Sequence, residues 1–269
     1  PMTRFVHLTD LHISHPDLAD PHLQSDTPAT LRRVVAVINA MDPQPDFVVA
    51  SGDLANQGDR ESYALVREIT APLKAPLVMA LGNHDKRAGF NAIFAPGLAD
   101  APYFHDTPQG DLHVITLDSS VPGKVAGALD DAQFEFLKAA LQRHPELAKL
   151  LVIHHPPRID PEALAWGSLD ESSSARLAEM LKGQHVAGIL SGHVHVNRVS
   201  HWHGIPVVIS NGLHSTIDLT ETRDLRIVEG TGFGICDWHP SGLSVSFAPL
   251  DPTARELARI DREQLKSFE

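Results

Sequence analysis

Seven short apolar runs in this chain each end abruptly in aspartate, histidine, asparagine or glycine. They span residues 5–9, 47–50, 77–81, 112–117, 150–153, 186–190 and 205–209. The runs are nearly continuous valine, isoleucine and leucine, as expected of strands that are buried on both faces. Segments with helical patterning lie between several of them, and strands that alternate with helices predict a layered α/β fold.

The segments between the runs carry recognisable helix-start signals. One helix is expected to begin at Thr27 as the N-cap, with proline at the first helical position. Others are expected to start at Asp59 and Asp130, where the aspartate would cap the helix. Two more are expected over residues 172–181 and 253–268.

The polar residues that end the runs are candidate metal ligands, namely Asp10, His12, Asp53, Asn83, His154, His193 and His195. Ligands collect at the carboxyl ends of strands in α/β sheets, and a random scatter of histidine and aspartate would not follow strand ends in this way. Because the set contains nitrogen and oxygen donors but no thiolate, it suits Zn, Mn, Fe or Co.

Seven ligand groups are too many for one tetrahedral ion, but they suit two ions if one carboxylate bridges them. Spacing alone allows either Asp10 or Asp53 to be that bridge. Two ions about 3.5–4 Å apart turn a bound water into hydroxide near neutral pH and stabilise both oxygens of an in-line displacement. Hydrolysis of a phosphate ester needs both effects, so metal-dependent hydrolysis is the expected chemistry.

The ordered blocks of this sequence resemble the calcineurin-like metallophosphoesterases. The blocks are Asp10-x-His12, Gly52-Asp53, Gly82-Asn83-His84-Asp85, His154 and Gly192-His193-x-His195. The resemblance implies a four-layer α-β-β-α sandwich with a dinuclear metal site at the C-terminal ends of the strands. It further implies that Asp10, His12 and His195 hold one ion, that Asn83, His154 and His193 hold the other, and that Asp53 bridges them.

The same resemblance implies roles in the reaction. His84 would lie near the leaving group, where it would stabilise the transition state or protonate the leaving alcohol, with Asn83 and Asp53 beside it as catalytic residues. Asp85 is expected to orient His84. His154 is selected over His155 because it stands two residues before a proline. Three further residues are candidates for contact with substrate, namely His155, His214 and His15. For His155 the alternative is that it supports the metal ligands from behind without contacting substrate.

Two stretches look most like the bacterial phosphodiesterases within this family. They are residues 154–157, His-His-Pro-Pro, and residues 82–85, Gly-Asn-His-Asp. Residues 117–120, Leu-Asp-Ser-Ser, also look like that branch. The expected function is therefore hydrolysis of a small phosphodiester, a 3',5'-cyclic nucleotide or a glycerophosphodiester, by metal-activated hydroxide. The alternatives are a phosphomonoesterase or nucleotide pyrophosphatase of the same family and, from another class, a non-catalytic metal-binding scaffold.

Other suggestive patterns are expected to be structural. Asp111 and His113 repeat the Asp-x-His pattern but open an apolar run, so they should lie at the opposite sheet edge. Residues 201–203, His-Trp-His, are expected in a solvated hairpin, and the glycine-rich residues 230–234 in a bend within a hairpin. The region from Trp202 to about residue 249 lacks helix signals and should consist of hairpins.

Length, charge and cysteine content limit the expected domain organisation, partners and location of the protein. The 269 residues are expected to form one domain, with the catalytic blocks in residues 5–215 and hairpins and a helix in residues 216–269. A formal net charge of −12 disfavours a nucleic-acid polymer as partner. With a single cysteine and no membrane-spanning or signal-like stretch, we expect a cytoplasmic protein without a membrane partner. The apolar stripe of the last expected helix would pack either on its own domain or on a partner subunit, and the second alternative would give a homodimer.

Overall fold

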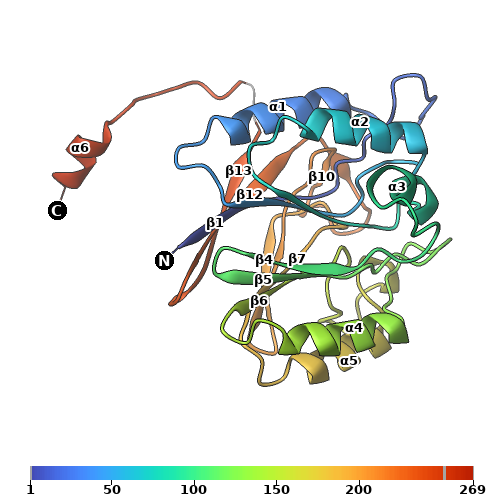
Figure 1. Ribbon diagram of the computed structural model, residues 1–269. Coiled ribbons are helices and arrows are strands. Elements are labelled where there is room, and N and C mark those ends of the chain that lie inside the picture. The colour runs from blue at the N-terminus through green and yellow to red at the C-terminus, as the bar shows by residue number, and fades with distance from the viewer. Residues whose placement is uncertain (1, 251–252, 269) are drawn as a thin grey trace.

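A computed structural model describes residues 2–250 and 253–268 and arranges them in four layers (Figure 1). Two β-sheets lie face to face at the centre. Helices α1 (Thr27–Asn39) and α2 (Arg60–Thr70) cover the outer face of one sheet, and α4 (Asp131–Gln142) and α5 (Glu171–Leu181) cover the outer face of the other. The expected four-layer α-β-β-α sandwich is confirmed.

The first sheet has five strands in the order β13-β12-β1-β2-β3. Its members are β1 (Thr3–Leu8), β2 (Phe47–Ser51), β3 (Leu77–Ala80), β12 (Gly232–His239) and β13 (Gly242–Pro249). Strands β1, β2 and β3 run parallel, and the β12–β13 hairpin joins them in antiparallel pairing. Three parallel strands of this sheet therefore end at one edge.

The second sheet has six strands in the order β4-β5-β6-β7-β9-β8. Its members are β4 (His105–Gln109), β5 (Leu112–Thr116), β6 (Ala148–Val152), β7 (Val186–Ser191), β8 (Arg198–Trp202) and β9 (Ile205–Ile209). Strands β5, β6, β7 and β9 are parallel. The remaining elements are the ribbon of β10 (Thr216–Ile217) and β11 (Ile227–Val228), the short helix η1 (Ala165–Gly167), and helices α3 (Arg87–Phe94) and α6 (Arg262–Lys266).

The seam between the two sheets is filled by apolar side chains. Phe5 of β1 and Phe47 of β2 are fully buried there and stack with ring centroids 4.9 Å apart. Strands β2, β5 and β6 are buried along their whole length, as their continuous apolar runs predict. This packing holds the strand ends of both sheets in register with one another.

The helix starts follow the expected caps with one correction. The side chains of Asp59 and Asp130 accept hydrogen bonds from Ser62 N and Gln133 N, as predicted. The cap of α1 is Asp26 rather than Thr27, because the Asp26 carboxylate reaches the backbone N–H of Ala29. A carboxylate near the positive end of a helix is the stronger cap of the two.

The expected helix over residues 253–268 is wrong for most of its length. Only α6 is helical, and residues 254–261 have no regular structure. All side chains from 253 to 268 are exposed, with Leu257 at 83%. Short helices in water are marginal without tertiary packing of their apolar face, so the apolar pattern alone does not sustain the helix.

The patterns expected to be structural lie away from the parallel strand ends. His113 sits in β5, where its Nε2 contacts Asp106 Oδ2 at 2.6 Å. His201 and His203 are exposed on the β8–β9 hairpin, as predicted. The glycine-rich stretch is corrected in part, because residues 232–234 pair within β12 instead of forming a bend. Among the described residues, no helix has the length and apolar character needed to cross a bilayer.

The stacked pair in the seam predicts a measurable loss of stability. Replacing Phe47→Ala removes a fully buried ring and leaves a cavity behind β2, so the free energy of unfolding should fall by about 3–5 kcal/mol in urea titrations. Val37→Ala on the exposed face of α1 is the control, since Val37 is 39% exposed. An equal loss in both variants would contradict the role assigned to the seam.

Candidate metal centre

The parallel strands of both sheets carry the candidate ligands just past their ends. Asp10 and His12 follow β1, Asp53 follows β2, Asn83 follows β3, His154 follows β6, and His193 and His195 follow β7. The structure brings their donor atoms into overlapping groups, such as Asp10, Asp53 and His154, whose ligand atoms all lie within 4.8 Å of one another. Groups with shared members link six of the seven candidates, and Asn83 lies in the loop that directly follows β3.

The closest approaches join histidine nitrogens to carboxylate oxygens. His195 Nε2 lies 3.1 Å from Asp10 Oδ1, and His154 Nε2 lies 3.2 Å from Asp53 Oδ2. His12 Nε2 is 3.7 Å from one oxygen of each carboxylate. His12 is thereby placed between the two carboxylates.

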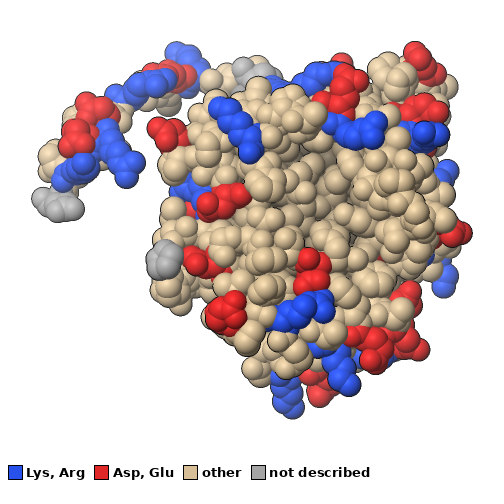
Figure 2. Space-filling model, in the orientation of Figure 1, with Lys and Arg blue, Asp and Glu red and all other residues tan. Residues whose placement is uncertain are grey.

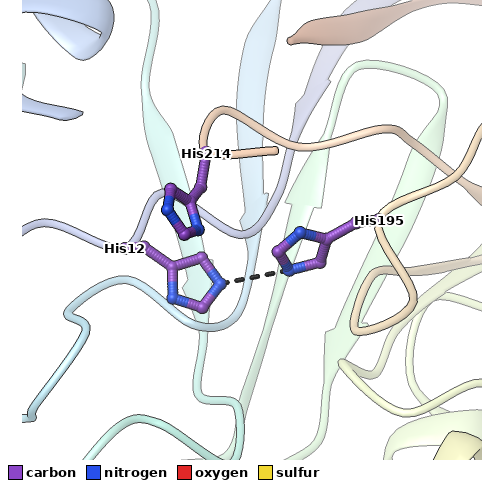
Figure 3. A group of neighbouring side chains, drawn as sticks. All are labelled: His12, His195 and His214. Carbon is purple, nitrogen blue, oxygen red and sulfur yellow. Dashed lines mark hydrogen bonds between the residues drawn. The ribbon is translucent and has the colours of Figure 1, made fainter. Parts of the chain in front are cut away.

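Two imidazoles face each other with the same ring nitrogen (Figure 3). His12 Nε2 and His195 Nε2 are 3.2 Å apart, and His214 lies beside them. His12 Nδ1 donates to Asn56 Oδ1 at 2.8 Å, and His195 Nδ1 donates to the Ser215 carbonyl at 3.1 Å. In neutral rings both Nε2 atoms are then acceptors. Only a proton or a cation between them makes this contact favourable.

Three buried polar atoms of the candidate ligands lack hydrogen-bond partners among the described residues. They are Asp10 Oδ1, Asn83 Oδ1 and His154 Nε2. A buried polar atom without a partner costs about 1–3 kcal/mol, so such atoms call for an explanation. Oxygen and imidazole nitrogen donors gathered without partners fit transition-metal ions, and the residues present therefore suit the two ions that the resemblance implies.

The hydrogen bonds on the far side of each ring fix which nitrogen faces the centre. His154 Nδ1 donates to the Ser51 carbonyl at 2.8 Å, which leaves Nε2 toward Asp53. His193 Nε2 donates a hydrogen bond to the Trp166 carbonyl at 2.6 Å, which leaves the lone pair of Nδ1 available to a metal ion. Partners of this kind set the tautomer and orientation of metal-binding histidines.

The electrostatics of the centre demand positive charge. Burial is the largest single effect on the pKa of Asp10 and raises it, but the charge of His195 and the hydrogen bonds of His12 and His195 together outweigh burial and hold the pKa well below its usual range. Burial also raises the pKa of Asp53, but the charge and hydrogen bond of His154, together with the charge of His12, outweigh burial and lower it. Burial lowers the pKa of His154, yet Asp53 raises it to about 9. Both carboxylates are therefore ionised, and a bound cation would replace the protons that the imidazoles otherwise supply.

The backbone at the strand ends is in an unusual conformation. Asp10, His12, Asp53, His193 and His195 all have positive φ, between 46° and 77°. Residues with side chains seldom occupy this left-handed region, and each such residue costs of order 1–3 kcal/mol unless its surroundings hold it. The strain is concentrated in candidate ligands, where it turns the side chains into the seam.

Two glycines allow the loops to close around the carboxylates. A Cβ atom on Gly82 would overlap Asp53 Oδ1, and a Cβ atom on Gly192 would overlap Thr9 Oγ1 and Asp10 Oδ2. The absence of a side chain at these two positions therefore lets the loops approach the two carboxylates, and at Gly82 also the backbone of Asp53.

Asp85 does not orient His84, and that expectation is corrected. Its carboxylate accepts hydrogen bonds from Leu54 N, Ala55 N and Gly82 N at 2.8–3.1 Å, and from the Tyr63 hydroxyl at 2.7 Å. Burial, together with the charge of Asp53, raises the pKa of Asp85 to about 6. Asp85 ties the loop after β2 to the loop after β3, and so holds Asp53 and Asn83 together.

His84 is positioned by other partners. Its ring Nδ1 donates to the Asn56 carbonyl at 2.9 Å, and its backbone N–H donates to Asp53 Oδ1 at 2.9 Å. The side chain is exposed and lines a cavity of about 830 Å³ above the centre. Its free Nε2 is therefore accessible to a molecule bound in that cavity.

The three residues considered for substrate contact are placed differently. His214 lines the cavity. His155 is fully buried and does not line it, because its Nε2 donates to the Val125 carbonyl and its Nδ1 contacts the Ser119 hydroxyl. His15 is also outside the lining, and its ring Nδ1 lies 3.7 Å from Asp17.

Several lining residues were not anticipated from the sequence. Asn56 stands three residues after Asp53, and a polar residue so close to a strand end was the one available signal. Trp166 and the β10–β11 ribbon also line the cavity, and no motif marks them.

Comparison with known proteins agrees with this geometry. Residues 3–197 match the family model for calcineurin-like phosphoesterases. A probable cyclic nucleotide phosphodiesterase from Rhodococcus erythropolis is 34% identical over 220 residues, which is 80% of this chain and 72% of that protein. The chain belongs to the calcineurin-like phosphoesterase family. It is accordingly a metallophosphoesterase that acts with two transition-metal ions.

Other proteins similar to this chain have related names. A cAMP/cGMP dual specificity phosphodiesterase from Mycobacterium tuberculosis is 32% identical and covers 80% of this chain and 69% of that protein. A probable glycerophosphodiester phosphodiesterase from Arcobacter nitrofigilis is 29% identical, with 82% of each chain covered. A dimetal phosphatase from Danio rerio shares the fold, with a TM-score of 0.67 at 14% identity over 92% of this chain and 96% of that one.

The close packing at Gly82 predicts loss of the metal centre without loss of the fold. In Gly82→Ala the new methyl group displaces the Asp53 carboxylate, so bound metal measured by elemental analysis should fall sharply. When the metal-free proteins are compared, the free energy of unfolding should change by only about 1–3 kcal/mol. Gly167→Ala is the control because its Cβ would meet nothing within 4 Å. Full metal content in Gly82→Ala would be evidence against the placement of Asp53.

Proposed function

We propose that this metallophosphoesterase hydrolyses 3',5'-cyclic nucleotides in the cavity above the candidate metal centre. The observation that carries the proposal is the composition of that cavity, which combines histidines of the centre with an apolar wall. Phosphodiester hydrolysis needs the histidines of the centre, and recognition of a nucleobase uses the apolar wall. Relatives named as cyclic nucleotide phosphodiesterases add support.

The proposed ligand set follows the seven strand-end residues. Asp10, His12 and His195 would hold one ion, Asn83, His154 and His193 would hold the other, and Asp53 would bridge them. The unpartnered atoms of Asp10, Asn83 and His154 support this assignment. Two bound ions would supply a strong nucleophile near neutral pH and charge stabilisation for the phosphoryl oxygens. Their identity, among Mn, Fe, Zn and Co, stays a prediction.

His84 is the proposed proton donor to the leaving oxygen. Hydrolysis of a cyclic nucleotide breaks one P–O bond to a ribose oxygen, and that oxygen takes up a proton as it leaves. While His84 Nδ1–H donates to the Asn56 carbonyl, the imidazolium form of the ring would give its Nε2 proton to the leaving oxygen and return to the neutral Nδ1–H form. Because an alkoxide is a poor leaving group, this transfer contributes to the rate.

The apolar wall of the cavity comes mainly from the β10–β11 ribbon. Ile217, Leu225, Ile227 and Val228 line it, and Trp166 adds an aromatic surface. Leu225 is 56% exposed and Ile227 is 63% exposed, so these side chains present apolar surface that a bound group would cover. A flat nucleobase gains from such burial, whereas the glycerol of a glycerophosphodiester has little apolar surface to place there.

A nucleic-acid polymer remains a poor candidate. On the face shown in Figure 2, lysine and arginine side chains are interspersed with aspartate and glutamate and form no continuous basic stripe. Affinity for a polymer rests largely on neutralising many phosphates, which this face does not offer. The cytoplasmic location and the homodimer stay predictions.

The role of His84 predicts a dependence on the leaving group. In His84→Gln, kcat for a cyclic nucleotide should fall about 10²–10⁴-fold, the usual contribution of a positioned acid. The loss for bis(p-nitrophenyl) phosphate should be smaller, since its phenolate leaves without a proton. His201→Gln on the exposed hairpin is the control. Equal losses on the two substrates would argue against proton donation.

The apolar wall predicts a selective effect on cyclic nucleotides. Ile227→Ser should raise KM for a cyclic nucleotide about tenfold, because burying one aliphatic side chain contributes about 1.5–3 kcal/mol. Hydrolysis of a glycerophosphodiester should be unaffected. Leu219→Ser is matched, since Leu219 is 61% exposed and lies outside the cavity lining. If the unmodified enzyme hydrolysed glycerophosphodiesters faster than cyclic nucleotides, the proposal that cyclic nucleotides are the preferred substrates would be wrong.

A further inference from the structure

Asn56 contacts two histidines of the proposed centre at once. Its side-chain Oδ1 accepts a hydrogen bond from His12 Nδ1 at 2.8 Å, and its carbonyl accepts one from His84 Nδ1 at 2.9 Å. Its backbone N–H donates to the Ile13 carbonyl at 2.9 Å, which ties the loop after β2 to the loop after β1. Asn56 therefore sets which nitrogen is free in both rings. The side chain of Asn56 does so for His12, and the backbone carbonyl of Asn56 does so for His84.

The amide of Asn56 can serve His12 in only one of its two orientations. Oδ1 accepts a hydrogen bond, whereas Nδ2 donates. A flipped amide would turn its N–H toward His12 Nδ1, and His12 would then carry its own proton on Nε2. That nitrogen faces His195 Nε2 at 3.2 Å, and a protonated Nε2 has no lone pair for an ion. The orientation of one amide thus decides whether His12 is prepared to bind.

Asp20 holds the amide in the productive orientation. Asn56 Nδ2 donates to Asp20 Oδ2 at 2.5 Å. An ionised carboxylate accepts hydrogen bonds and has none to donate, so a flipped amide would bring two acceptor oxygens together at this contact. Asp20 lies in the loop between β1 and α1, far in sequence from Asn56, and its contact with the amide closes a chain from His12 through Asn56 to Asp20.

We propose that Asp20 and Asn56 act as positioning residues that keep the ring proton of His12 on Nδ1 and so reserve Nε2 for a metal ion. The inference rests on the proposed function, in which His12 is a ligand. Neither residue belongs to the proposed ligand set. Partners behind a metal-binding histidine commonly fix its tautomer, and here the usual carboxylate acts through an intervening amide.

The first test compares two aspartates of the same loop. Asp20→Ala should weaken the binding of one of the two ions by roughly 10–100-fold in chelator competition, and leave the other ion in place. Asp17→Ala removes the same charge from the same loop and should bind both ions normally, since the Asp17 side chain is 91% exposed. Ring ¹⁵N NMR of the metal-free proteins should show the Nδ1–H form of His12 in the control and loss of that form in Asp20→Ala.

A second test exchanges the carboxylate and the amide between positions 20 and 56 and asks whether metal binding is restored. In the double variant Asp20→Asn/Asn56→Asp, the new carboxylate at position 56 accepts from His12 Nδ1 and also from the new amide at position 20. Metal affinity and the Nδ1–H form of His12 should both return to near the unmodified values. Asn56→Leu removes the acceptor, and adding Asp20→Asn to it should restore nothing.

Two results would overturn the proposal. One is an Asp20→Ala protein whose His12 tautomer and metal affinity match those of Asp17→Ala, and the other is a charge-exchanged protein as impaired as Asn56→Leu. The tautomer measurement uses metal-free protein, so it judges the Asn56–Asp20 pair by itself. Failure of the unmodified protein to bind two ions or to hydrolyse any diester would instead count against the proposed function.

Discussion

Two buried carboxylates set the main physical constraint on this molecule. Asp10 and Asp53 are almost completely shielded from water where the strand ends of both sheets meet. An isolated charge in such a place is prohibitively costly, so it must be paired. His12, His154 and His195 each use one ring nitrogen for a partner in the protein and turn the other toward a carboxylate. The sandwich, the loops after its parallel strands and the glycines in those loops bring these groups to one point.

Much of the architecture was predictable because its signals are local. Continuous apolar runs mark strands buried on both faces, and aspartates such as Asp59 and Asp130 mark helix starts. The expectation for residues 253–268 failed because an apolar stripe describes a helix only when something covers it, and the side chain of Leu257 lies in solvent. Periodicity reports what a segment would do if packed, and it cannot report whether packing partners exist.

The candidate site was predictable to the extent that its residues end strands. The seven ligand candidates could be found by that phasing, and six of them lie in linked groups of possible donor atoms. Asp85 was misjudged because its partners, such as Tyr63 and Leu54, lie more than twenty residues away in the chain. Asn56 and Asp20 were missed for a similar reason. Their importance arises from a contact between two loops, and neither loop has a pattern that announces it.

The division of the candidate ligands between the two sheets has a consequence for the life of the protein. Four of them follow strands of the five-stranded sheet and three follow strands of the six-stranded sheet. Ions held by both sets would join the sheets as a non-covalent cross-link, and part of their binding free energy would be free energy of folding. Scarcity of metal would then lower the amount of folded enzyme that escapes proteolysis, as well as the activity of each molecule.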